Sequence, residues 1–142
     1  MATPFLIFGD APDQPTGLSR ILGDLATRIH ANREALDLEV VTCGYAPWVG
    51  LPQQGQPAPA LHDSYRRWVF NDFASRGAQA LHAAYRYYFG IRPGIVFSVW
   101  DPARVAAVSS AQLPIKRWGY FPVDAMTPTS RITGPAGSCL DT

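Results

Sequence analysis

A chain of 142 residues with a formal net charge of +1 is long enough for one domain with a sizeable core, and it lacks the basic footprint of a nucleic-acid binder. Its hydrophobic content of 47% and charged content of 16% are those of an ordinary globular protein. No apolar stretch approaches the roughly 20 residues of a membrane-spanning helix, and the first residues lack the pattern of a signal peptide. These features predict a cytoplasmic protein whose Cys43 and Cys139 are free thiols.

The chain opens with a predicted strand, a glycine-bearing loop and a helix. The continuous apolar run at 5–10 indicates a buried parallel strand, and Thr16 is a good N-cap for the helix that follows. Apolar residues then recur every three or four positions, which predicts one buried face of a helix over 18–31. A strand at 37–43 completes a β-α-β unit, whose crossover we expect to be right-handed.

The middle of the chain begins with a segment at 44–60 that is rich in proline, glycine and glutamine and predicts a long surface loop. A short strand is predicted at 66–70. A helix is expected to begin at Ser75 and to stop at Gly90, since glycine is a common residue after the end of a helix. The apolar run at 95–99 then predicts another buried strand.

The last predicted helix begins at Asp101 and Pro102, because aspartate is favoured at the N-cap and proline at the first helical position. A further strand is expected at 116–121. The segment 126–142 has few apolar residues and no periodicity, so we expect a disordered tail behind one domain at 1–125.

This alternation of strands and helices predicts an α/β fold: a three-layer, Rossmann-like parallel sheet with helices on both faces. The carboxyl ends of parallel strands share one edge of the sheet, where such folds bind their ligands. Six residues at or near this edge are the candidates for substrate binding: Asp10, Gly17, Arg20, Trp100, Asp101 and Asp124.

Two of these candidates point to an anionic ligand. Gly17 would let a diphosphate approach the N-terminus of the first helix closely, although a glycine needed only for the turn is the alternative. Arg20, one turn into that helix, would reach an anionic group, or it is a solvated surface residue.

The other four candidates suit a sugar. The carboxylates of Asp10, Asp101 and Asp124 would accept strong hydrogen bonds from sugar hydroxyls. The alternative for Asp101 is a helix cap, and Asp10 would serve equally to brace its loop. Trp100 would stack on a sugar face, or it packs in the core.

No metal site or bound cofactor is predicted. The three histidines, His30, His62 and His82, have no spacing suited to a metal, and the two cysteines form no CxxC pair. The chain also lacks a GxSxG motif or a Cys–His pairing typical of hydrolases.

The order and spacing of these segments resemble the N-terminal, acceptor-side domain of GT-B glycosyltransferases of the retaining family 4 type. The likeness extends over 4–125, and four stretches carry it: GLSRILGDLA at 17–26, LEVVT at 38–42, IVFSVWDP at 95–102 and WGYFPVD at 118–124. The resemblance implies transfer of a sugar from a nucleoside-diphosphate donor to an acceptor hydroxyl with retention. The partners it implies are thus a nucleotide sugar and a hydroxyl acceptor.

Two departures from the family pattern change the expectation. The histidine that many members have near the donor sugar is replaced here by the segment 121–124. The second domain, which in the family carries basic residues and paired glutamates for the donor, is missing from these residues. We therefore expect a truncated glycosyltransferase domain that is inactive alone and self-associates through apolar surface near Trp100 and Trp118. The alternatives are a stand-alone nucleotide- or phosphate-binding module without catalysis, and a remnant that folds poorly.

Overall fold

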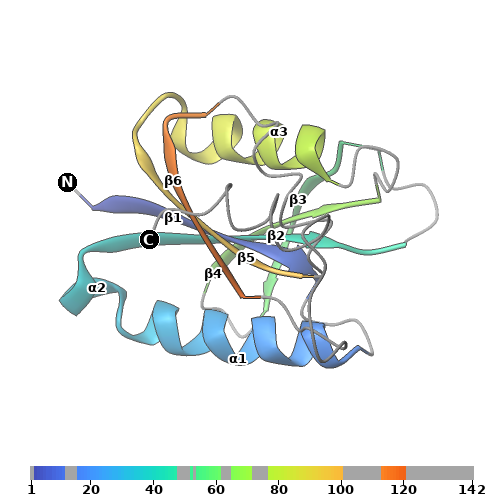
Figure 1. The fold of residues 1–142 in the computed structure, drawn as a ribbon, viewed down its shortest axis with the longest axis horizontal. Helices are drawn as coiled ribbons and strands as arrows, with labels where there is room; N and C mark the ends of the chain where they lie inside the picture. The colour runs from blue at the N-terminus through green and yellow to red at the C-terminus, as the bar shows by residue number, and fades with distance from the viewer. Residues whose placement is uncertain are drawn as a thin grey trace, which may run out of the picture.

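The computed structural model describes residues 2–11, 16–47, 52, 54–61, 65–71, 77–100 and 113–120. They form an α/β fold built on one six-stranded, mostly parallel mixed sheet (Figure 1). The helix predicted to start at Asp101 and the tail predicted at 126–142 lie outside the described residues. In the part of the chain that is described, no helix has the length and apolar character needed to cross a membrane.

The five strands and two helices predicted within these ranges are all present. The elements in chain order are β1 (Thr3–Asp10), α1 (Gly17–Ala31), α2 (Arg33–Leu36), β2 (Leu38–Tyr45), β3 (Gln56–Leu61), β4 (Tyr65–Phe70), α3 (Ala78–Phe89), β5 (Gly94–Val99) and β6 (Ile115–Tyr120). The short helix α2 was not anticipated, and it ends at Leu36; the next residue, Asp37, has a φ of 55°, in the left-handed region.

The prediction of one long loop over 44–60 was wrong in part. The strand β2 continues to Tyr45, and the end of the segment belongs to β3, which pairs antiparallel with β4 from Gln56 opposite Val69. Pro57 and Pro59 hid this strand from sequence reasoning, because proline cannot donate to a ladder. An edge strand tolerates proline, since it needs backbone donors on one side only, and β3 lies at the edge of the sheet.

The sheet has the order β3-β4-β2-β1-β5-β6. The pairs β1–β2, β1–β5, β2–β4 and β5–β6 are all parallel, so the parallel arrangement predicted for the main strands is confirmed, and β3 alone makes the sheet mixed. The chain runs outward from β1 through β2 to β4 and then returns to β5 on the other side of β1. This reversal places a topological switch point between β1 and β5.

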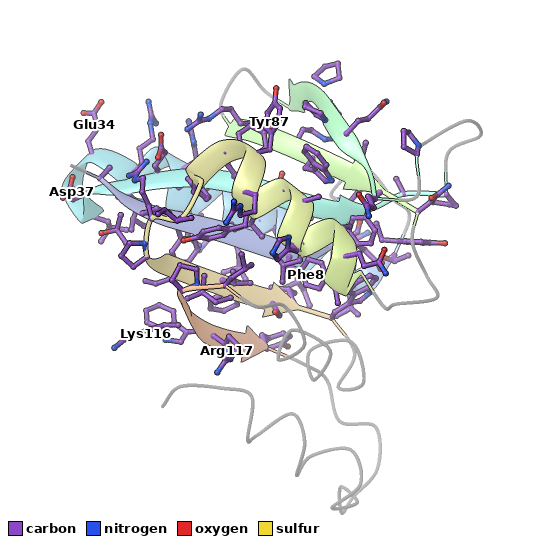
Figure 2. All side chains as sticks on the ribbon, turned by 90° about the horizontal axis from the view of Figure 1, so that it is seen from above. Phe8, Glu34, Asp37, Tyr87, Lys116 and Arg117 are labelled. Atoms are coloured by element: carbon purple, nitrogen blue, oxygen red, sulfur yellow. The ribbon has the colours of Figure 1, made fainter. Side chains whose placement is uncertain are left out.

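Alternate side chains of β1 pack into two separate clusters. Ile7 packs with Leu22 of α1, whereas Phe8 packs with Leu81 of α3, and all four side chains are fully buried. Figure 1 draws α1 below the sheet and α3 above it, and Figure 2, which looks onto α3, shows Phe8 beneath that helix. Each buried side chain of this size contributes roughly 1.5–3 kcal/mol, so packing onto β1 holds both helices in place.

Candidate functional site

The carboxyl ends of β1 and β5 meet at the switch point, at one edge of the sheet. Gly9 is in register with Val99, so Asp10 and Trp100 follow at the same level on neighbouring strands. Connections leave these two strands in opposite directions, and open α/β sheets bind their ligands in the crevice that results. The structure thus brings Asp10, Trp100 and the start of α1 to one edge, which we call the switch-point edge.

Thr16 ties the start of α1 to the end of β1. It has an extended backbone, and its hydroxyl oxygen accepts a hydrogen bond from the backbone N–H of Ser19 at 3.0 Å, as the predicted N-cap should. The same hydroxyl donates to Oδ2 of Asp10 at 3.0 Å. Asp10 therefore braces the loop, which was one of its two expected roles. The bond uses one carboxylate oxygen, and Oδ1 makes no hydrogen bond to another described residue.

Gly17 is the first residue of α1, and nothing in the fold requires a glycine there. A Cβ added to Gly17 would meet no atom within 4 Å, whereas one added to Gly9 would lie 2.8 Å from Cδ1 of Leu22 and would collide with the carbonyl oxygen of Val99. The backbone of Gly17 is also outside the left-handed region. The space above Gly17 is therefore open, and the turn does not account for its lack of a side chain.

Arg20 and the helix N-terminus bring positive charge to this edge. Arg20 is exposed, and its guanidinium forms no hydrogen bond or ion pair with another described residue. The first turn of α1 contains no acidic residue that would offset the partial positive charge of the helix N-terminus. Asp10 is the carboxylate that the described residues place beside this turn.

Trp100 packs in the core rather than at the surface. Its side chain is 3% exposed, and its ring contacts Phe8 and Phe70 edge-to-face at centroid distances of 5.3 and 6.0 Å. The ring of Trp100 is therefore part of the core at the switch-point edge. Trp100 itself is therefore not part of the exposed apolar surface expected near it, whereas Trp118 on β6 is 40% exposed.

The remaining candidates, Asp101 and Asp124, lie outside the described residues. Cys43 is a free, fully buried thiol, and burial raises its pKa well above the ordinary value, so it is a packing residue and not a nucleophile. Among the residues that the structure describes, no group of three or more His, Cys, Asp and Glu side chains is arranged to hold a metal ion.

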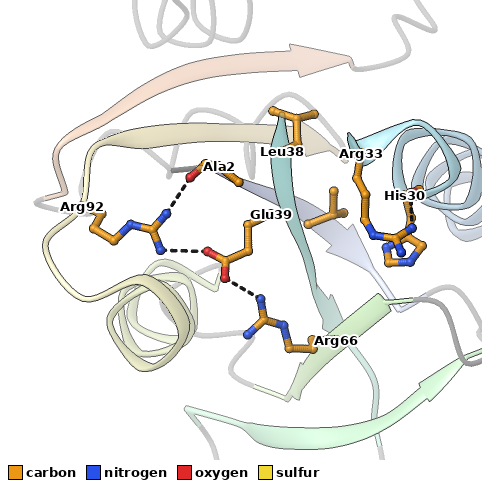
Figure 3. A pocket seen from close by; sticks show the side chains of 8 residues that line it. Ala2, His30, Arg33, Leu38, Glu39, Arg66 and Arg92 are labelled. Atoms are coloured by element: carbon orange, nitrogen blue, oxygen red, sulfur yellow. Dashed lines mark hydrogen bonds and ion pairs between the residues drawn. The ribbon is translucent and has the colours of Figure 1, made fainter. Parts of the chain in front are cut away.

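A pocket at the opposite edge of the sheet escaped sequence reasoning. It has a volume of about 430 Å³ and lies at the amino ends of β1 and β2 (Figure 3). We call it the amino-edge pocket, and its lining consists of Ala2, His30, Arg33, Leu38, Glu39, Val40, Arg66 and Arg92.

One signal in the sequence could have pointed to this pocket. Glu39 is the single charged residue of β2, and a carboxylate within an apolar strand needs a partner. Its partners, Arg66 and Arg92, lie 27 and 53 positions further along the chain, so no local pattern connects them.

The sequence matches no protein-family model, and comparison of the chain with curated proteins and with solved structures finds no significant match.

Proposed function

We propose that this chain is the acceptor-side half of a GT-B glycosyltransferase, a three-layer Rossmann-like domain whose switch-point edge binds the diphosphate of a nucleotide sugar. The observation that carries the proposal is the strand order β4-β2-β1-β5-β6 with the N-terminus of α1 at its switch point. That combination is typical of nucleotide-binding α/β folds. The fold alone supports a nucleotide ligand, and the sequence resemblance to family 4 enzymes is the reason for proposing a nucleotide sugar.

The first turn of α1 supplies the donors for a diphosphate. Thr16 satisfies the N–H of Ser19 through its hydroxyl and the N–H of Arg20 through its carbonyl at 3.2 Å. Among the described residues nothing accepts a hydrogen bond from the N–H groups of Gly17 and Leu18, as expected for the first donors of a helix, so they are available to a ligand. The open space above Gly17 lets a phosphate approach them, and Arg20 adds a full positive charge one turn later.

The carboxylates are assigned to the acceptor. Asp10, with Oδ2 occupied by Thr16, would accept a hydrogen bond from an acceptor hydroxyl on Oδ1, and Asp101 and Asp124 are proposed for further hydroxyl contacts. The contribution of this domain to the transfer is positioning, together with stabilisation of the departing diphosphate by helix dipole and charge. Catalysis in GT-B enzymes uses a cleft between two such domains, so we expect the chain by itself to bind donor without useful turnover.

The test is a titration of the chain with a panel of nucleoside diphosphates, followed by amide chemical shifts. We expect dissociation constants in the millimolar range, which is a binding free energy of about −4 kcal/mol. The affinity is low because a site on one domain alone stays open to water, which screens its charges. Gly17→Ala should keep or raise stability, since its Cβ enters open space and alanine favours helix, but should weaken binding several-fold because the methyl group blocks the phosphate.

Thr27→Ala is the matched control, because Thr27 is exposed on the same helix and away from its N-terminus. This variant should leave nucleotide binding unchanged. Equal affinity of the wild-type chain and Gly17→Ala, or shifts centred away from 16–20, would refute the assignment of the diphosphate to this edge.

The alternative function is a stand-alone nucleotide- or phosphate-binding module that uses the same edge without catalysis. It is favoured by the hydrogen bond between Asp10 and Thr16, which gives this carboxylate a structural role. The two functions separate in an assay that joins the chain to a donor-binding second domain, with nucleotide sugars and hydroxyl acceptors present. Acceptor-dependent release of nucleoside diphosphate supports the glycosyltransferase, and donor binding without release supports the module.

A further inference from the structure

Glu39 holds two arginines in the amino-edge pocket. Its Oε1 accepts a hydrogen bond from Nη2 of Arg66 at 2.9 Å, and its Oε2 accepts one from Nη1 of Arg92 at 2.8 Å (Figure 3). Nη2 of Arg92 also donates to the backbone oxygen of Ala2 at 2.6 Å. Both guanidinium groups are therefore held in place, yet the side chains remain 51% and 33% exposed to water.

A third arginine, Arg33, lines the pocket and has no carboxylate partner among the described residues. Nη1 of Arg33 donates to the backbone oxygen of His30 at 2.8 Å, and a carbonyl at the end of α1 offsets only part of a full charge. Glu34 and Asp37, the acidic residues that flank this segment, do not line the pocket.

The pocket consequently has an excess of positive charge. Three arginines and one glutamate line it, which leaves a formal charge of +2 from these side chains, although only Arg66 and Arg92 contact the carboxylate. Burial raises the pKa of Glu39, but its hydrogen bonds to Arg66 and Arg92 outweigh this effect, so the pKa lies below the usual value and the carboxylate is ionised at neutral pH. Its role is to position two arginines, and it cancels only one of their charges.

We propose that the amino-edge pocket binds a phosphate group of a small molecule, with Arg33, Arg66 and Arg92 as its cationic contacts. Arginine presents its donors in a planar fork that matches the oxygens of a phosphate, and two of these forks are positioned before any ligand arrives. A pocket of about 430 Å³ accommodates a phosphate or a diphosphate. The inference is independent of the proposed function, because the pocket shares no residue with the switch-point edge.

The test is a titration of the full chain with inorganic pyrophosphate, followed by amide chemical shifts and by the side-chain resonances of the histidines. We expect saturable shifts at residues 33–39 and 66 and an affinity that falls with added salt. Desolvation and the charge of Arg33 lower the pKa of His30. A bound phosphate offsets the second of these causes, so the pKa of His30 should rise when pyrophosphate is added.

Arg33→Gln and Arg66→Gln should each weaken pyrophosphate binding by about fivefold or more, since each removes a charge-assisted contact. Arg28→Gln is the matched control: it makes the same change of charge at an exposed residue of α1 that does not line the pocket. Arg33 takes part in neither ion pair of Glu39, so Arg33→Gln should leave both intact.

Three outcomes would overturn the proposal. Equal weakening by Arg28→Gln would show general attraction to a charged surface. Shifts centred on 16–20 and insensitive to Arg33→Gln would place the anion at the switch-point edge instead. The absence of saturation at millimolar pyrophosphate would show that the pocket binds no phosphate.

Discussion

Single residues decide the chemistry at both edges of the sheet. At the amino edge, Arg92 is held from two sides, because its guanidinium binds Glu39 and its backbone oxygen accepts a hydrogen bond of 2.6 Å from the hydroxyl of Tyr85. Burial raises the pKa of Tyr85 to about 12, so the hydroxyl keeps its proton and remains a donor well above neutral pH. At the switch-point edge, Thr16 has the corresponding role of fixing Asp10.

Glu39 should make stability depend on pH in the acidic range. Its pKa in the folded chain lies below the ordinary value for a glutamate, because Arg66 and Arg92 hydrogen-bond to the ionised form. Its contribution to stability is therefore present above the ordinary, unfolded-state pKa and is lost as the pH falls through the lower, folded-state pKa. We expect Glu39→Gln to lower the free energy of unfolding at pH 7 by about 1 kcal/mol, a value kept small because both arginines are partly exposed.

This prediction is checked by urea unfolding of the wild-type chain and Glu39→Gln at pH 7 and at pH 3. The difference between the two proteins should shrink at the lower pH. Glu34→Gln, which changes an exposed glutamate of α2, serves as the control and should leave stability unchanged at both values. A difference for Glu39→Gln that is as large at pH 3 as at pH 7 would contradict the ion-pair explanation.

At the scale of elements, the join between β1 and α1 sets the switch-point edge. The strand ends at Asp10, the helix begins at Gly17, and the Thr16 hydroxyl links the two. The helix is also held from its middle, where Leu22 packs in the cluster that contains Phe5 and Ile7 of β1. Packing thus places the helix axis, while the cap places its first turn.

Thr16→Ala should cost about 1 kcal/mol of stability, because the N–H of Ser19 loses its cap and Asp10 loses its brace. Thr16→Ser keeps a hydroxyl at the same position and should recover most of this loss. Thermal or urea unfolding of the two variants provides the comparison. If Thr16→Ser is as unstable as Thr16→Ala, the hydroxyl is not what stabilises the start of α1.

At the scale of the whole molecule, β6 is the outermost strand at one side of the described sheet. Three of its residues, Lys116, Trp118 and Tyr120, are exposed and share one face of the strand. The ring of Phe5, which belongs to the buried cluster between the sheet and α1, lies 6.3 Å from that of Trp118, centroid to centroid. The exposed face of β6 is therefore continuous with this apolar cluster. Figure 2 shows Lys116 and Arg117 on this outer strand.

The exposed rings of β6 should drive self-association of the purified chain. Trp118 is 40% and Tyr120 47% exposed, and apolar surface at a sheet edge is a common site of association. We expect the double variant Trp118→Ser/Tyr120→Ser to shift the chain toward monomer in sedimentation velocity. Tyr87→Ser removes a ring that is 63% exposed on α3 and serves as the control. Equal loss of association in the control would show that β6 has no special part in it.

Local patterns in the sequence determined most of the elements. The apolar runs of β1 and β5 and the helical spacing in α1 depend on neighbours a few positions apart, and the structure confirms them. The position of Asp10 at the carboxyl edge followed from the same reasoning, because parallel strands end at one side of a sheet. The periodicity of side chains is a local property, so no knowledge of distant partners was needed.

Tertiary contacts alone decided the pairing of β3, the burial of Trp100 and the cluster around Glu39. The proline-containing segment of β3 forms a strand because it pairs with the edge of β4. Trp100 is buried because it packs against Phe8 and Phe70, which belong to two other strands. Glu39 meets Arg66 and Arg92 across 27 and 53 positions, because β2 lies beside the start of β4 and the turn before β5. Contacts between segments so far apart depend on strand order, which a reading of local propensity does not contain.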